Sequence, residues 1–138
     1  MLAEAQLAGG LDIFRLSLHV LAATVWIGGQ IVLAGLLPTI RGFGPEAPGK
    51  VARAFARLSW PAFGLLIITG IWNITAAPSP QSSAWSAVLG IKILCVVLAG
   101  AAVGAHTRVK DPRWRGASAG LGLAFSLAAM VLGVALAG

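Results

Sequence analysis

Residues 18–33 read LHVLAATVWIGGQIVL, and this stretch holds no charged side chain and one histidine, His19. It lies within a longer, mostly apolar run over residues 11–40. A helix needs about 20 mostly apolar residues to cross the roughly 30 Å of hydrocarbon in a bilayer. Since the run shows none of the alternation typical of a strand, it predicts a membrane-spanning helix.

Three more apolar runs follow, and turns rich in Gly, Pro or Ser separate them. Only helices and closed barrels satisfy their backbone hydrogen bonds in lipid, and a barrel would need alternating strands. We therefore predict an all-α integral membrane four-helix bundle that forms a single domain over residues 1–138. The expected helices cover residues 11–40, 51–77, 84–109 and 116–138.

The composition agrees with a membrane protein and argues against several soluble classes. The 138 residues are 58% hydrophobic and 10% charged, whereas soluble domains carry about 25% charged residues. So few charges cannot cover a water-facing surface, which argues against a soluble enzyme or a nucleic-acid-binding protein. The single cysteine, Cys95, excludes an intramolecular disulfide and a Cys-based zinc cluster.

Lysine and arginine indicate the orientation of the chain. They gather around the first and third predicted loops, and the second loop has no charged residue. Because loops rich in Lys and Arg stay in the cytoplasm, we expect loops one and three there and both termini outside. The net charge of +6 then reflects topology and not a polyanionic partner. The residues are Arg41, Lys50, Arg53 and Arg57 near loop one, and Arg108, Lys110, Arg113 and Arg115 near loop three.

The 18 glycines predict close contacts between helices. Gly28 and Gly29 lie near the middle of the first expected helix, and Gly116 and Gly120 are four residues apart in the fourth. Small residues at such positions let helix backbones approach each other in lipid.

Polar and sulfur-bearing side chains fall at a similar depth in the expected helices. Ionisable groups inside lipid are costly, so they point to a function. With a rise of about 1.5 Å per residue, every helix places at least one such group about 3–13 Å toward the outside from its midpoint. This outer layer holds His19, Thr69, Asn73, Lys92, Cys95 and Met130.

Helical spacing also groups the polar residues on one face of each helix. We expect each such face to point into the bundle and away from lipid. The shared faces hold Arg15, His19, Trp26 and Gln30 in the first helix, Thr69 and Asn73 in the second, Lys92, Cys95, Ala99, Ala102 and His106 in the third, and Ser126 and Met130 in the fourth.

His19 is the strongest candidate for chemistry, as a metal or haem ligand or a proton carrier; the alternative is a histidine satisfied by its neighbours. For Lys92, a role inside the bundle and snorkelling to the outer surface stay open. Cys95 and Met130 can equally be inert core residues. We expect His106 at the cytoplasmic membrane edge, more than about 20 Å from His19 along the helix axes.

Three segments resemble the copper resistance D family of membrane proteins. They are LHVLAATVWIGGQIVL, with His19 and Trp26; ARAFARLSWPAFGLLIITGIWN, with Thr69 and Asn73; and SAWSAVLGIKILCVVLAG, with Lys92. The resemblance implies a role in copper homeostasis at the bacterial cytoplasmic membrane, with copper bound or passed through the outer half of the bundle. Fuller members of that family have more transmembrane helices, so it also implies a partner subunit or a homo-oligomer.

Two further chemical interpretations accompany this resemblance. Soft Cu(I) favours thiolate, thioether and imidazole ligands, which makes His19, Cys95 and Met130 the candidate copper ligands. The histidine and lysine helices are also similar to the membrane protoporphyrinogen oxidase family, which binds haem b. That likeness implies His19 as an axial haem ligand, Lys92 at or beside the other haem face, and Arg15 as a propionate partner.

We therefore expect copper handling as the function, and the two alternatives differ from it in class. Copper handling would make the chain a binding or transport protein and not an enzyme, whereas haem binding would make it a haem-linked membrane oxidoreductase. A structural subunit of a larger membrane complex is the third possibility. In each case Trp26, Thr69 and Asn73 are supporting residues, the lipid bilayer is a partner, and no nucleic acid is expected.

Overall fold

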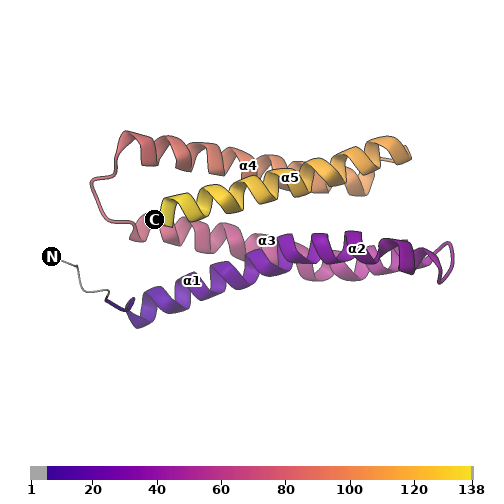
Figure 1. Ribbon diagram of the computed structural model, residues 1–138, viewed down its shortest axis with the longest axis horizontal. Coiled ribbons are helices and arrows are strands. Elements are labelled where there is room, and N and C mark those ends of the chain that lie inside the picture. Colours follow the sequence, from indigo (N-terminus) through magenta and orange to yellow (C-terminus); the bar gives the residue numbers. More distant parts are fainter. Residues whose placement is uncertain (1–5, 138) are drawn as a thin grey trace. The chain divides into compact units, whose positions relative to one another are not determined.

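The computed structural model describes residues 6–137, and its regular structure over this range is entirely helical. Within residues 6–137, four helical stretches are long and apolar enough to cross a membrane, and Figure 1 shows their arrangement along the chain. This confirms the all-α class and the predicted number of spans, and the bounds agree within a few residues. The stretches are Gly10–Arg41, Ala47–Ala76, Ser83–Arg108 and Pro112–Ala137.

The first stretch contains three consecutive elements, which are α1 (Gly10–Ala23), η1 (Thr24–Gly28) and α2 (Gly29–Arg41). The other three are α3 (Ala47–Ala76), α4 (Ser83–Arg108) and α5 (Pro112–Ala137).

The described part of the chain divides into two compact units. The N-terminal unit takes in the described residues up to Gly29 together with Thr39–Ala77, so it contains α1, η1 and α3. The C-terminal unit takes in Gln30–Pro38 and the described residues from Pro78 onward, so it contains α4 and α5.

In the N-terminal unit, α1 and η1 pack against α3 in an antiparallel pair. The Trp26 ring lies 4.4 Å from Phe63 and 5.4 Å from Trp60, measured between centroids, and Trp26 is only 2% exposed. Near this cluster, a Cβ added to Gly29 would overlap the ring of Phe55. Gly29 thus permits the close helix contact that the sequence predicted there.

The π-helical turn η1 was not predicted. Its i→i+5 hydrogen bonds widen the helix between His19 and Gly29, and such turns occur frequently at functional sites. Thr24 Oγ1 donates a hydrogen bond of 2.8 Å to the carbonyl of Val20 at this point. Threonine bonds of this kind compete with the regular helix pattern and often bend a helix.

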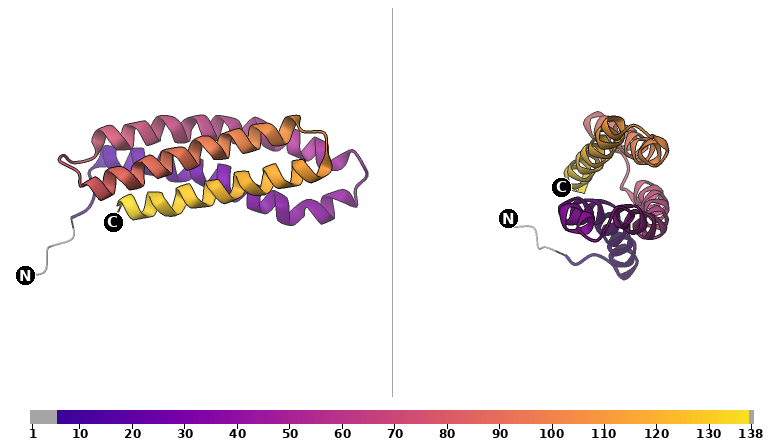
Figure 2. Two further views of the ribbon diagram at one scale, coloured as in Figure 1. Left: turned by 90° about the horizontal axis from the view of Figure 1, so that it is seen from above. Right: turned by 90° about the vertical axis from the view of Figure 1, so that its right-hand side faces the viewer.

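In the C-terminal unit, α4 and α5 form a helical hairpin, and both views in Figure 2 keep them side by side. Ala99 is 1% exposed, and a Cβ added to Gly122 would lie 2.7 Å from Val103 Cγ2. Small residues on the facing surfaces therefore set the separation of this pair.

Polar groups define the ends of the α4–α5 hairpin. The Ser82 hydroxyl accepts a bond of 3.1 Å from the Trp85 amide and caps α4. At the other end, His106 Nδ1 donates to the carbonyl of Arg115 over 2.7 Å. His106, which we expected at the membrane edge, is half-buried, and its hydrogen bond links the end of α4 to the start of α5.

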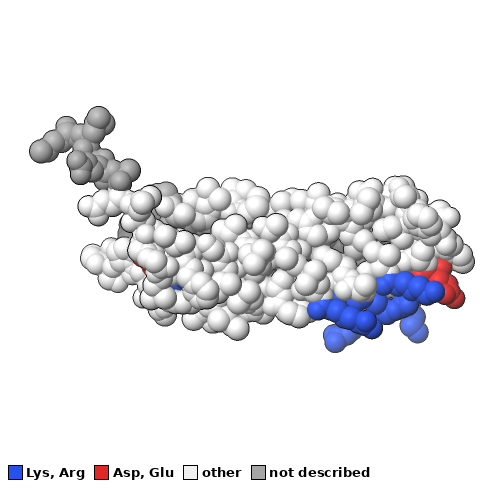
Figure 3. All heavy atoms as spheres, turned by 90° about the horizontal axis from the view of Figure 1, so that it is seen from below, with Lys and Arg blue, Asp and Glu red and all other residues white. Residues whose placement is uncertain are grey.

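Charged side chains are gathered as the sequence indicated. Figure 3 shows a face on which nearly all visible Lys and Arg side chains lie at one end, beside acidic groups, and most of the face is uncharged. Arg41, Lys50, Arg53 and Arg57 are all exposed, and Lys50 pairs with Glu46 over 3.3 Å. The long uncharged remainder is what a bilayer requires of a spanning segment.

Candidate functional site

His19 of α1 and Thr69 of α3 form the central contact of the candidate site. His19 Nδ1 lies 2.7 Å from Thr69 Oγ1, and Thr69 is 1% exposed. The Thr69 hydroxyl also donates to the carbonyl of Leu65 over 2.7 Å. The same hydroxyl also lies 3.3 Å from the carbonyl of Leu66. When Thr69 donates its one hydrogen to either carbonyl, it accepts from His19 Nδ1–H, and a neutral His19 then has its lone pair on Nε2.

This contact depends on the register between α1 and α3. His19 follows Arg15 by one helical turn, and Thr69 precedes Asn73 by one turn. In an antiparallel pair, the register that joins His19 to Thr69 places Arg15 and Asn73 at the same level, about 6 Å further along. The spacing predicted these two shared faces, and the structure brings them together.

Arg15 carries a buried positive charge at that level. The residue is 9% exposed, and its Nη2 lies 3.0 Å from Oδ1 of Asp12, whose side chain is 53% exposed. Within the described residues, the buried Nε of Arg15 and the buried Oδ1 of Asn73 have no hydrogen-bond partner. One hydrogen-bond donor, on Arg15, and one acceptor, on Asn73, are therefore buried here without a partner, which costs free energy.

Aromatic contacts lie on both sides of these polar groups in the N-terminal unit. Phe14 and Trp72 meet edge to face with centroids 6.5 Å apart, next along the chain to Arg15 and Asn73. The cluster around Trp26 lies two turns beyond His19 in the other direction. The polar atoms thus lie between apolar side chains, where electrostatic interactions are stronger than in water.

The remaining predicted residues lie in the C-terminal unit. Lys92 and Cys95 are half-buried on the predicted face of α4, in line with the buried Ala99. Lys92 Nζ would lie 3.0 Å from a Cβ at Gly133 of α5, so this glycine gives the ammonium group room. No hydrogen bond or ion pair joins Lys92 to the part of the chain that the structure describes.

Met130 differs from its expected orientation. Ser126 is 3% exposed as predicted, but Met130 is 46% exposed. Ala129, three residues after Ser126, takes the buried position instead. Positions three and four residues on lie on either side of the same helix face, and here the smaller residue lies inward.

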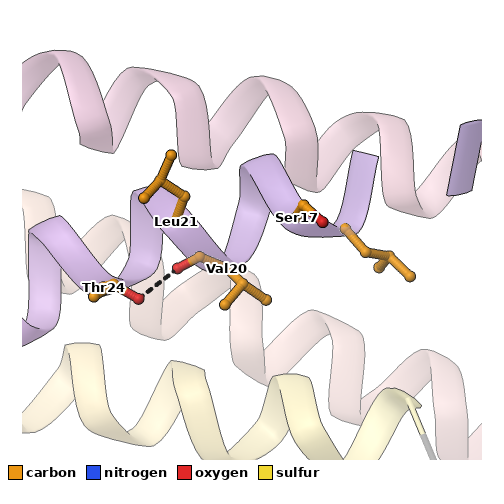
Figure 4. Close-up of a pocket in the computed structure, with 5 residues that line it drawn as sticks. Ser17, Val20, Leu21 and Thr24 are labelled. Carbon is orange, nitrogen blue, oxygen red and sulfur yellow. Dashed lines mark hydrogen bonds between the residues drawn. The ribbon is translucent and has the colours of Figure 1, made fainter. Parts of the chain in front are cut away.

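No metal cluster is evident in residues 6–137. These residues contain no group of three or more His, Cys, Asp or Glu side chains that could hold a metal ion. A shallow hollow of about 420 Å³ is lined by Leu16, Ser17, Val20, Leu21 and Thr24, all from α1 and η1 (Figure 4). It is a mostly apolar surface groove on one helical stretch.

The sequence interpretation missed Asp12 as a partner of Arg15, although the i,i+3 spacing of opposite charges would have indicated it. The unpaired buried atoms of Arg15 and Asn73 had no such local signal.

Comparison with known protein families, curated proteins and solved structures finds no match for this chain.

Proposed function

We propose that this chain is an integral membrane protein that binds haem b, with His19 Nε2 as an axial ligand. The observation that carries the proposal is the 2.7 Å contact between His19 Nδ1 and Thr69 Oγ1, in which the hydroxyl accepts from Nδ1–H when it donates to the Leu65 carbonyl. A ligating histidine almost always donates its other ring N–H to an oxygen acceptor, which orients the ring and raises its basicity. Thr69 supplies that acceptor from a buried position.

The residues around His19 also suit the chemistry of haem b. Haem b carries two carboxylates on an apolar ring, so it needs both a cationic partner and an apolar surround. Arg15 is a buried guanidinium one turn from His19, and its Nε is orphaned. Arginine is well suited to carboxylates because its planar fork matches their geometry.

In this proposal, residues of this chain bind the haem and orient its histidine ligand. Thr69 holds the His19 ring, Arg15 neutralises a haem carboxylate, and the rings of Trp26 and Phe63 exclude water on the deeper side. The haem would supply one-electron transfer when bound. The resemblance adds Lys92 as a further candidate residue and implies the bacterial cytoplasmic membrane, and the distribution of Lys and Arg supports both termini outside.

Copper handling is the second candidate function, with His19, Cys95 and Met130 as proposed ligands. The position of Cys95 on the half-buried face of α4 favours it, because Cu(I) prefers thiolate and imidazole ligands away from water. Met130 is a weaker candidate copper ligand than Cys95, because it is 46% exposed. A single oriented imidazole suits haem, which can be held by one axial ligand, better than it suits a soft ion that needs several.

Absorption spectra and metal analysis of the purified protein test the proposal. We expect a Soret band that shifts on reduction in the parent and in His106→Ala, and its loss in His19→Ala. His106 is the matched control because its Nδ1 also donates to an oxygen, in the other unit. Stoichiometric copper without a Soret band would support the second candidate. A purified protein that contains neither copper nor haem would indicate a structural subunit.

A further inference from the structure

The ion pair between Asp12 and Arg15 joins two very different environments. Arg15 is 9% exposed, whereas the Asp12 side chain is 53% exposed. A buried guanidinium needs a counter-charge, because an unpaired charge in an apolar surround is costly. Asp12 supplies it from the same helix, three residues away, through one nitrogen and one oxygen at 3.0 Å.

Arg15 has binding capacity that Asp12 does not use. A guanidinium has five N–H donors, and the buried Nε of Arg15 has no acceptor in the described residues. The antiparallel register that joins His19 to Thr69 puts Asn73 of α3 at the level of Arg15, and the buried Asn73 Oδ1 also has no partner in the described residues. An amide side chain presents either its oxygen or its NH₂ group when it rotates, so Asn73 can complement an acceptor or a donor.

We propose that Arg15 and Asn73 form a carboxylate-exchange site, in which the carboxylate of an amphiphilic ligand replaces Asp12 on Arg15. Asp12 then moves into water, where its charge is solvated. Asp12 is well suited to leave, because its side chain is 53% exposed and it holds Arg15 through a single nitrogen–oxygen contact of 3.0 Å. The ligand class is an apolar ring system that carries a carboxylate on a short arm.

Haem b is a ligand of this class, and in that respect the inference rests on the proposed function. It adds that Asp12 competes with the ligand for Arg15. Removing the Asp12 charge should therefore tighten binding of a carboxylate ligand, while a role in holding Arg15 in place would make the same substitution weaken it. The sign of the effect separates the two roles.

The test uses protoporphyrin IX, which has the carboxylates without the iron, and its dimethyl ester, which lacks the charges. Binding is titrated by fluorescence to the full chain in detergent, for the parent, Asp12→Asn and Arg15→Gln. Asp111→Asn is the matched control, because Asp111 caps the start of α5 in the other unit. Helix content by circular dichroism shows that each variant is folded.

We expect Asp12→Asn to bind the free acid about two- to fivefold more tightly than the parent, which corresponds to one exposed ion pair. Arg15→Gln should bind the acid about tenfold more weakly, as expected for loss of a charge-assisted hydrogen bond. Both variants should bind the ester like the parent, and Asp111→Asn should change neither affinity.

Equal or weaker binding of the acid by Asp12→Asn would overturn the inference, and so would equal changes for acid and ester. A parent that binds neither form would also overturn it. The proposed function fails separately, if His19→Ala keeps its haem. In that case the porphyrin acid, which needs no axial ligand, still decides the role of Asp12.

Discussion

The α1–α3 pair and the α4–α5 hairpin are both packed antiparallel helices, but they bury different side chains. The α4–α5 pair buries Ala99, Gly122, Ser126 and Ala129, which are all small. The pair of α1 and η1 with α3 buries small residues too, Ala22, Ser59 and Ala62, but it adds Arg15, Trp26 and Thr69, which are charged, aromatic and polar. Small residues permit close contact, whereas polar groups cost free energy unless they are paired. Buried polarity beyond what packing needs therefore marks the α1–α3 pair as the candidate functional region.

The largest stability effect is expected from Gly122→Ala in the α4–α5 hairpin. The added Cβ would lie 2.7 Å from Cγ2 of Val103 and 3.4 Å from the Val103 backbone nitrogen. Val is β-branched and stiff, so the helices must separate, at a cost of about 1–3 kcal/mol. Thermal unfolding in detergent measures it. Gly116→Ala is the control on the same helix, since an added Cβ meets nothing within 4 Å. A Gly122→Ala protein as stable as this control would refute close packing here.

A smaller effect is expected from Gly29→Ala in the N-terminal unit. Its Cβ would overlap the far edge of the Phe55 ring, which can swing aside more readily than a stiff Val side chain. We expect a loss of about 1 kcal/mol, at the lower end of the range for overpacking. The same unfolding measurement applies, with Gly64→Ala as the open control on α3. If Gly29→Ala destabilises more than Gly122→Ala, the contrast between the two hairpins is wrong.

The sequence predicted much of the fold because it depends on local pattern. Apolar length gave the four spans, and helical spacing gave the faces that carry Arg15, His19 and Lys92. The face of Met130 was missed because Ala129 and Met130 are adjacent positions that compete for one buried place. The turn η1 was missed because its hydrogen-bond pattern has no clear local sequence signal.

The candidate site could be predicted only in part. His19 and Thr69 were each identified, but their contact joins residues 50 positions apart and depends on the register of two helices. That register follows from how the aromatic rings and Gly29 pack, which is tertiary information. The position of the Leu65 carbonyl beside the Thr69 hydroxyl, which favours a proton on His19 Nδ1, is likewise information that only the structure provides.

The most direct test of the central claim is haem affinity across a Thr69 series, measured by titration of the Soret band. Thr69→Val keeps the shape but removes the acceptor of His19 Nδ1–H, whereas Thr69→Ser keeps the hydroxyl. Thr75→Val is the control on α3, because Thr75 bonds only within its own helix among the described contacts. We predict about 10–100-fold weaker binding in Thr69→Val, as for loss of a group that orients a ligand, and near-parental binding in Thr69→Ser and Thr75→Val. Haem affinity in Thr69→Val equal to that of the parent would contradict the account.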